Sequence, residues 1–222
     1  MAQAADAPFI VALNLTRRCN LACAHCYLDA GTRRNGDDAE LATAEVAEVL
    51  DGIASLGGET MVVLTGGEPL LRADLEAIVR HAASLGLMVV VGTNGTVLDA
   101  SRVAALVEAG VAGVGISLDS LDPDSHDAFR GRPGAWARTM AAIDACRQGG
   151  LAFQIHFSVT NRNAAELDAM IAFARSAGAL VLNVFFLVCT GRGERFADVS
   201  AAIYDDVLRR VTRAAREETR LL

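Results

Sequence analysis

The chain has 222 residues, of which 52% are hydrophobic and 21% charged, and its formal net charge at pH 7 is −7. A hydrophobic fraction of this size can fill a buried core, which argues against disorder, and the length fits one domain or at most two. The acidic balance argues against nucleic-acid binding, because such binding needs a basic surface to neutralise phosphates. The chain contains no lysine, so it offers no lysine Schiff base or lysine general base.

Short apolar runs alternate with amphipathic stretches along the whole chain. Most of the runs are apolar almost throughout, which is typical of parallel strands covered on both faces. Six strands are expected, at Phe9–Leu15, Thr60–Thr65, Met88–Thr93, Ala112–Leu118, Phe153–Val159 and Leu180–Leu187.

The segments between these runs show the helical period, as Val46, Leu50 and Ile53 do. Glycines such as Gly110 follow several of the segments, at the position where a helix commonly ends. Helices are expected at Thr43–Leu56, Asp74–Leu85, Ala100–Ala109, Ala135–Arg147, Ala164–Ala177 and Ala201–Arg220, with a polar loop at Ala30–Glu40.

Six successive βα units predict an α/β fold with a parallel sheet and right-handed connections. The pattern fits a doubly wound sheet or a barrel-like arc, and it has fewer units than the eight of a closed barrel. In either architecture the functional loops gather at the carboxyl ends of the strands.

Three cysteines follow the first expected strand with C-x3-C-x2-C spacing, at Cys19, Cys23 and Cys26. Thiolates bind soft metals and iron–sulfur clusters, and a cubane [4Fe–4S] cluster normally takes four cysteines. Three ligands would leave one iron open to another molecule. The alternative is a structural zinc site with His25 as the fourth ligand. It is less favoured, because the ring of His25 would have to fold back and no second cysteine pair follows.

Polar clusters follow other expected strands. The run Gly66-Gly67-Glu68-Pro69 combines a backbone that a ligand can approach closely with a carboxylate that can bind an ammonium group. The alternative is a tight turn with Glu68 at a helix N-terminus. Asn94 lies in a turn sequence after the third strand.

Later in the chain, Ser117 and Asp119 alternate around Leu118 and could face the same side, or they could cap a helix. Arg130 follows them, and Arg192 lies between two glycines after the sixth strand, where it would suit an anion or simply belong to a surface loop.

The cysteine motif, the Gly66–Pro69 run, Thr93-Asn94-Gly95 and Ser117-Leu118-Asp119, in that order, resemble the radical S-adenosylmethionine (radical SAM) superfamily. The resemblance spans Phe9 to about Gly193. It implies an open partial TIM barrel of six βα units and a single core domain over residues 1–222. It also implies a [4Fe–4S] cluster on the three cysteines, with S-adenosylmethionine (SAM) bound to the remaining iron.

The resemblance assigns further roles. His25 is placed against the adenine, and Gly66, Gly67, Glu68 and Pro69 are placed at the methionine amino group. The remaining assignments are Ser117 and Asp119 at the ribose and carboxylate end of SAM, Arg130 at the SAM carboxylate, and Asn94 in the lining of the pocket.

By the same resemblance, an electron from a donor such as flavodoxin or ferredoxin cleaves SAM, and the 5′-deoxyadenosyl radical abstracts hydrogen from a substrate. The sequence looks most like the SPASM-type branch, which modifies haem-type tetrapyrroles or ribosomal peptides. A tetrapyrrole is the first expectation, with Arg192 and Arg195 binding its carboxylates. The alternatives are a peptide maturase, a glycyl-radical activating enzyme and a non-catalytic zinc module.

That branch usually carries a C-terminal auxiliary-cluster domain, which this chain is expected to lack because only Cys146 and Cys189 remain. Cys146 is expected to be a small buried hydrophobe, while a role for Cys189 stays open. An arc of six strands has two open edges. We therefore hypothesise a minimal or truncated core covered by a partner chain, a dimer mate or its substrate.

The expected location is cytoplasmic. Met1–Pro8 has no signal-peptide pattern, and no apolar run approaches the roughly 20 residues of a membrane helix. Five cysteines, three of them clustered, do not form a disulfide framework, which favours a reducing compartment.

Overall fold

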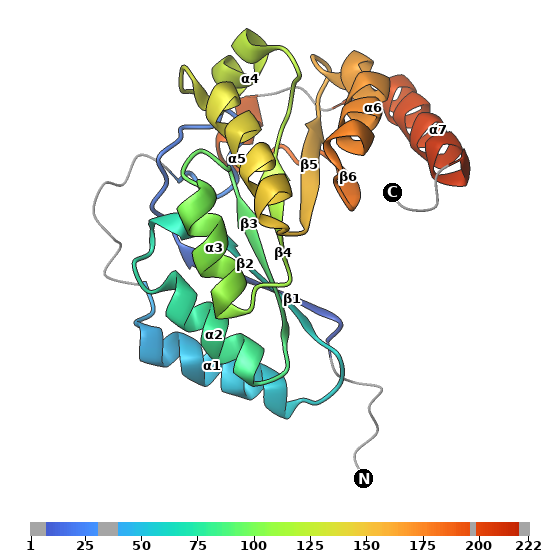
Figure 1. The fold of residues 1–222 in the computed structure, drawn as a ribbon. Coiled ribbons are helices and arrows are strands. Elements are labelled where there is room, and N and C mark those ends of the chain that lie inside the picture. Colours follow the sequence, from blue (N-terminus) through green and yellow to red (C-terminus); the bar gives the residue numbers. More distant parts are fainter. Residues whose placement is uncertain (1–7, 31–39, 196–198, 218–222) are drawn as a thin grey trace.

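One curved parallel sheet organises the molecule, whose computed structural model describes residues 8–30, 40–195 and 199–217 (Figure 1). Its six strands lie in the order β1-β2-β3-β4-β5-β6, so each strand pairs with its neighbours in sequence. This confirms the expected α/β partial barrel. The strands are β1 (Ile10–Thr16), β2 (Met61–Gly66), β3 (Met88–Thr93), β4 (Gly113–Ser117), β5 (Phe153–Val159) and β6 (Val181–Phe186).

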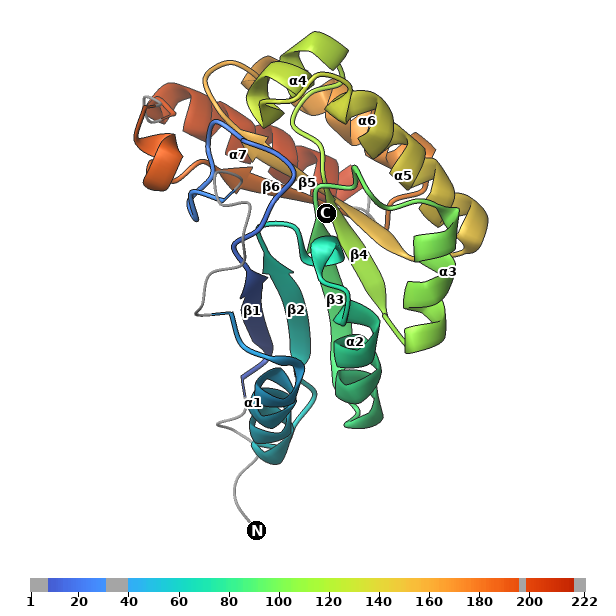
Figure 2. The same cartoon turned by 90° about the vertical axis from the view of Figure 1, so that its left-hand side faces the viewer.

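Helices cover the outer, convex face of the sheet (Figure 2). Helix α7 packs beside α6 (Figure 1). The α-helices are α1 (Thr43–Ser55), α2 (Leu75–Ser84), α3 (Ala100–Ala109), α4 (Pro123–Arg130), α5 (Ala135–Gly149), α6 (Leu167–Ala177) and α7 (Ala201–Glu217). Short 3-10 turns are η2 (Pro69–Leu71), η3 (Ala164–Glu166) and η4 (Gly191–Arg195).

Helix α4 is the one element that the sequence analysis missed among the helices of the described residues. Its start was marked in the sequence: Asp122 accepts a hydrogen bond from the amide of Ser125 at 2.8 Å, and Pro123 opens the helix. Gly131 ends it in the left-handed conformation. The expected loop at Ala30–Glu40 falls mostly on residues 31–39, which lie outside the described residues.

The two faces of the sheet differ in chemistry. On the outer face, Val62, Leu64 and Ile116 are fully buried under the helices. The opposite, concave face, here called the lumen, carries small, apolar or uncharged polar side chains at alternate positions. Paired residues of neighbouring strands share a face, so the lumen positions are Ile10, Ala12, Asn14, Met61, Val63, Thr65, Met88, Val90, Gly92, Gly113, Gly115, Ser117, Gln154, His156, Ser158, Val181, Asn183 and Phe185.

Two further expectations can be compared with the structure. Cys146 is completely buried on α5, as expected, and burial raises the pKa of its thiol to about 11. No helix in the described part of the chain has the length and apolar character to cross a bilayer.

Candidate cluster-binding site

The cysteine loop, residues 17–30, lies at the carboxyl end of β1 and closes one side of a cavity of about 210 Å³ at the mouth of the lumen. Cys19, Cys23 and Cys26 all line this cluster cavity. Its other walls come from the loops after β2, β3 and β6, from α4, and from lumen positions of β2, β3, β4 and β5. Among the residues with expected roles, the cavity is lined by His25, Gly66, Gly67, Asn94, Ser117, Arg130 and Arg192.

All three cysteine sulfurs accept N–H hydrogen bonds, which stabilise a thiolate over a thiol. Burial raises the pKa of Cys19 to about 11, so this thiol must lose a proton when it binds metal. The donors are the Leu21 amide to Cys19 at 3.5 Å, Asn94 Nδ2 to Cys19 at 3.8 Å, Arg130 Nη1 to Cys23 at 3.7 Å and the Ala30 amide to Cys26 at 3.4 Å.

This donor set fits an iron–sulfur cluster, which is held by thiolates and tuned by hydrogen bonds to sulfur. Among the described residues, no group of three or more His, Cys, Asp or Glu side chains converges closely enough for a single metal ion. A cluster of several irons spaces its thiolate ligands more widely than one ion does.

Helix α4 holds the middle of the cysteine loop. The amides of Ala22 and Ala24 donate to the carbonyls of Arg130 and Phe129 at 3.2 and 2.9 Å. A Cβ on Gly131 would lie 2.5 Å from the Ala22 carbonyl oxygen, so this close approach requires glycine. The helix that sequence analysis missed is therefore one of the main supports of the site.

Arg130 links α4 to both the cysteine loop and β4. Its guanidinium forms an ion pair with Asp119 and donates to the Cys23 sulfur, and both charged side chains are almost fully buried. Burial lowers the pKa of Arg130, but the charges of Asp119 and Cys23 outweigh this effect and hold the pKa above its usual value. Asp119 also accepts from the Ser158 amide at 3.1 Å, so it lies behind the cluster cavity rather than in its wall.

The glycine pair after β2 brings two chain segments into contact. Gly67 and Glu68 donate their amides to the carbonyls of Thr16 and Arg18 at 2.7 and 2.8 Å. A Cβ on Gly67 would overlap the Arg18 carbonyl, and Gly66 has a φ of 131°. Both glycines line the cluster cavity, so their backbone is exposed to a ligand there.

Glu68 faces away from the cluster cavity and is completely buried. Its carboxylate accepts from the Leu70 amide at 3.1 Å, from Thr93 Oγ1 at 2.8 Å and from the Asn94 amide at 2.8 Å. Pro69 is buried at the start of η2. The carboxylate thus joins the loops after β2 and β3, and burial raises its pKa to about 7 against the lowering effect of these hydrogen bonds.

We expect Glu68→Gln to destabilise the cluster-free protein, because its amide can satisfy only one of the two backbone donors, at a cost of about 1–3 kcal/mol. The pKa of Glu68 is raised from 4.5 to about 7, so the folded wild type binds more protons than the unfolded chain in this interval. Its stability should therefore fall as pH rises between these values, by at most about 1.4 kcal/mol per pH unit, relative to the variant. Urea unfolding at several pH values tests this, and parallel pH profiles would contradict it.

Asn94 anchors the start of the cysteine loop from β3. Its side-chain amide donates to Asn20 Oδ1 at 2.9 Å as well as to Cys19, and Asn20 donates to Thr96 Oγ1 at 2.8 Å. The sequence analysis gave no role to Asn20. Its position directly after Cys19, within the cysteine motif, is the sequence feature that could have indicated one.

His25 stacks on Phe129 with ring centroids 4.3 Å apart and an interplanar angle of 8°. Burial, followed by the charge of Arg130, lowers its pKa to about 4, so the imidazole is neutral near pH 7. Its Nδ1 is buried without a hydrogen-bond partner among the described residues. The ring lines the cluster cavity and can stack on a planar ligand there.

Arg192 binds the cysteine loop itself. Its Nε donates to the Cys23 carbonyl at 2.8 Å, and its Nη1 donates to Asp29 Oδ1 and the Ala30 carbonyl at 2.8 and 2.6 Å. The structure thus places this guanidinium on protein acceptors, whereas a substrate carboxylate was expected. Arg195 is the last residue of η4, and its side chain lies outside the described part of the structure.

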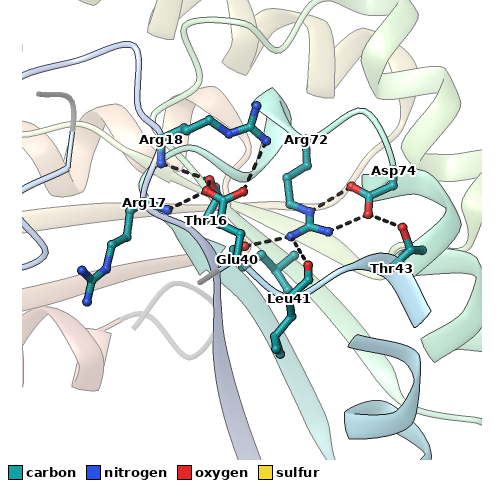
Figure 3. Close-up of polar contacts among 9 residues, drawn as sticks. Thr16, Arg17, Arg18, Glu40, Leu41, Thr43, Arg72 and Asp74 are labelled. Carbon is teal, nitrogen blue, oxygen red and sulfur yellow. Dashed lines mark hydrogen bonds and ion pairs between the residues drawn. The ribbon is translucent and has the colours of Figure 1, made fainter. Parts of the chain in front are cut away.

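A second polar cluster fixes the chain at the entrance to the cysteine loop (Figure 3). The buried guanidinium of Arg72 donates to the Leu15 and Leu41 carbonyls at 2.9 and 3.1 Å and binds Asp74 at 2.9 and 2.6 Å. The hydrogen bond from Arg72 holds the pKa of Asp74 at about 2. Glu40 accepts from Thr16 and the Arg17 amide and pairs with Arg18 at 3.5 Å, so this cluster ties the end of β1 to the segment before α1.

Comparisons with known proteins show the family and the fold of the chain. Residues 13–174 match the Radical SAM superfamily. The AdoMet-dependent heme synthase of Methanosarcina barkeri is 40% identical over 203 residues, 91% of this chain and 57% of that protein. The mycofactocin maturase MftC of Mycobacterium ulcerans is 33% identical over 189 residues, 85% of this chain and 50% of that protein. SuiB of Streptococcus suis, crystallised with S-adenosylmethionine, has the same fold, with TM-score 0.80 and 17% identity over 95% of this chain and 48% of that one.

The chain is a parallel α/β partial barrel with three cysteines on one loop at its mouth. The chain belongs to the radical SAM superfamily, whose cofactors are a [4Fe–4S] cluster and SAM. It spans about half the length of the curated relatives it matches.

Proposed function

We propose that this chain is a single radical SAM core domain, in which Cys19, Cys23 and Cys26 hold a [4Fe–4S] cluster. When bound and reduced, the cluster and SAM supply a 5′-deoxyadenosyl radical that abstracts hydrogen from a substrate. The convergence of the three thiols on one cavity with the Gly66-Gly67 backbone carries this proposal.

The residues of this chain would bind the cluster and SAM and orient them in the cavity. Asn94 and Arg130 donate N–H groups to cysteine sulfurs, which favours the thiolates that the cluster needs. We assign the Gly66-Gly67 backbone to the methionine amino group and Ser117 to the ribose, because all of them line the cluster cavity. Glu68 and Asp119 support this wall from behind, through Asn94 and Arg130.

For the substrate, we favour a haem-type tetrapyrrole, supported by the similarity to the AdoMet-dependent heme synthase. A ribosomal peptide is the second candidate, supported by the similarity to mycofactocin maturase. Both assignments rest on relatives of which the alignment covers 57% and 50%. We further propose that flavodoxin or ferredoxin is the electron donor and that a partner chain, a dimer mate or the substrate covers the open edges at β1 and β6.

The test is anaerobic reconstitution with iron and sulfide, followed by addition of dithionite and SAM. We expect about four irons per chain, as a single cubane requires, and formation of 5′-deoxyadenosine. Colourless protein that binds one zinc per chain and forms no 5′-deoxyadenosine would refute the proposal in favour of a zinc module.

A further inference from the structure

His156 is a lumen residue for which the sequence analysis gave no role. It lies inside β5, paired with Ser117 of β4 and Asn183 of β6, and it lines the cluster cavity. The residues assigned to SAM lie mostly on loops beyond the strand ends, whereas His156 faces the lumen below those loops. This is the direction from which a substrate would meet SAM.

The ring of His156 is held in a fixed place. A Cβ on Gly115 would lie within 2.5 Å of its Nε2, so the imidazole lies against the backbone of β4, where only glycine leaves room. On the other side, the ring of Phe185 meets it edge-on, with centroids 5.4 Å apart and an interplanar angle of 77°. Gly115 and Phe185 thus confine the imidazole from two neighbouring strands.

The imidazole is neutral and has unused hydrogen-bonding capacity. Burial, followed by the charge of Arg130, lowers its pKa to about 4. Within the described residues neither ring nitrogen has a hydrogen-bond partner, and the residue lines the cluster cavity. By contrast, Asn183 already donates to Gln154 Oε1 at 2.7 Å. A neutral imidazole offers one N–H donor and one acceptor.

No strand position of the lumen is Asp, Glu or Arg, and the guanidinium of Arg130, which lines the same cavity as His156, is already paired with Asp119. Asn14 does not line the cluster cavity, and its Oδ1 accepts from Tyr27 at 3.0 Å. An anionic group that reaches the strand positions of the lumen therefore meets neutral donors there. A hydrogen bond from a neutral donor to a carboxylate is stronger than one between two neutral groups.

We propose that His156 is a substrate-binding residue, whose imidazole N–H donates a hydrogen bond to a side-chain carboxylate of a tetrapyrrole in the lumen, with Gly115 as the positioning residue. This inference rests on the proposed function and deepens it, because it names a lumen residue that recognises a substrate carboxylate. The geometry also explains why a strand in the centre of the site carries glycine at position 115.

The test is an absorbance titration of the reconstituted, SAM-bound holoenzyme with metal-free coproporphyrin III, which has no iron for the imidazole to ligate. We expect His156→Leu to weaken binding about 10-fold to 100-fold, as loss of a hydrogen bond to a charged group does. His156→Gln keeps an N–H donor and should stay within about threefold of wild type. The visible absorption of the cluster, recorded before porphyrin is added, shows that each variant is loaded.

Gly115→Ala should reproduce the loss by displacing the ring, and it should add nothing in the His156→Leu background, because both changes act on one contact. The matched control is Gly52→Ala on α1, where a Cβ meets no atom within 4 Å. Additive effects of the two lumen substitutions would mean that Gly115 acts on folding rather than through His156.

The outcomes separate the inference from the proposed function. Equal porphyrin affinity of wild type and His156→Leu would overturn the inference, as would an effect seen only with iron(III) coproporphyrin III, which would indicate iron ligation. Wild type that forms 5′-deoxyadenosine but binds no porphyrin would also overturn it while leaving SAM cleavage intact. Wild type that binds porphyrin but never cleaves SAM would refute the proposed function instead.

Discussion

Cys23→Ala should abolish both the iron–sulfur cluster and SAM cleavage. The remaining thiols, Cys19 and Cys26, cannot hold a cubane that normally takes four cysteine ligands and here has three. The substitution also removes the acceptor that Arg130 Nη1 contacts at 3.7 Å. Iron content, visible absorption and 5′-deoxyadenosine formation after anaerobic reconstitution measure the effect.

The chain provides a matched control for this substitution. Cys146 is equally a buried cysteine, but it lies on α5 and does not line the cluster cavity. Cys146→Ala should therefore keep the iron content and the spectrum of wild type. A Cys23→Ala protein with an unchanged spectrum, or a Cys146→Ala protein that has lost it, would show that the cysteine assignment is wrong.

Arg130→Met should destabilise the cluster-free protein by about 3–5 kcal/mol, because it leaves the carboxylate of Asp119 buried without its charged partner. It should also reduce the iron content, since the Cys23 sulfur loses a donor and α4 loses a tie to the cysteine loop. Urea unfolding of the cluster-free protein measures the first effect, and iron content after reconstitution measures the second.

The double variant Asp119→Asn/Arg130→Met separates charge from packing. It removes both charges, keeps an oxygen for the Ser158 amide, and should recover most of the lost stability. It should not recover the iron content, because the donor to Cys23 is still missing. If the single and double variants were equally unstable, the buried charge would not be the cause.

The architecture could be predicted from the sequence because each buried parallel strand produces a continuous apolar run of residues. The runs Val62–Leu64 and Val89–Val91 are apolar throughout and have their outward-facing residues fully buried, so composition alone marks them. Strand β5 was also predicted with the bounds that the structure shows, but the polar face formed by Gln154, His156 and Ser158 was not anticipated. The alternation indicates that one face of β5 is polar. That this face lines the lumen follows only from the position of the strand inside an open arc.

The cysteines could be predicted as a site because their spacing on one loop is a local property. The supports of that loop could not, because they come from residues far apart in sequence. Arg130 contacts the Cys23 sulfur across 107 positions, and Arg192 contacts the Cys23 carbonyl across 169. Sequence spacing carries no information on such pairs, so the contacts of Arg192 with the cysteine loop could not be anticipated.

Glu68 illustrates the same limit. Its residue type and its place after two glycines were consistent with a ligand-binding carboxylate. In the structure three donors, from Leu70, Thr93 and Asn94, converge on it in a fully buried position. Whether a carboxylate faces a cavity or the core depends on the tertiary packing of neighbouring loops.

Mössbauer spectroscopy of protein reconstituted with ⁵⁷Fe, recorded with and without SAM, tests the central claim most directly. If Cys19, Cys23 and Cys26 hold three irons and leave the fourth without a protein ligand, SAM should change the signal of one iron site and leave the others as they were. Identical spectra with and without SAM, at SAM concentrations that saturate binding, would contradict the account.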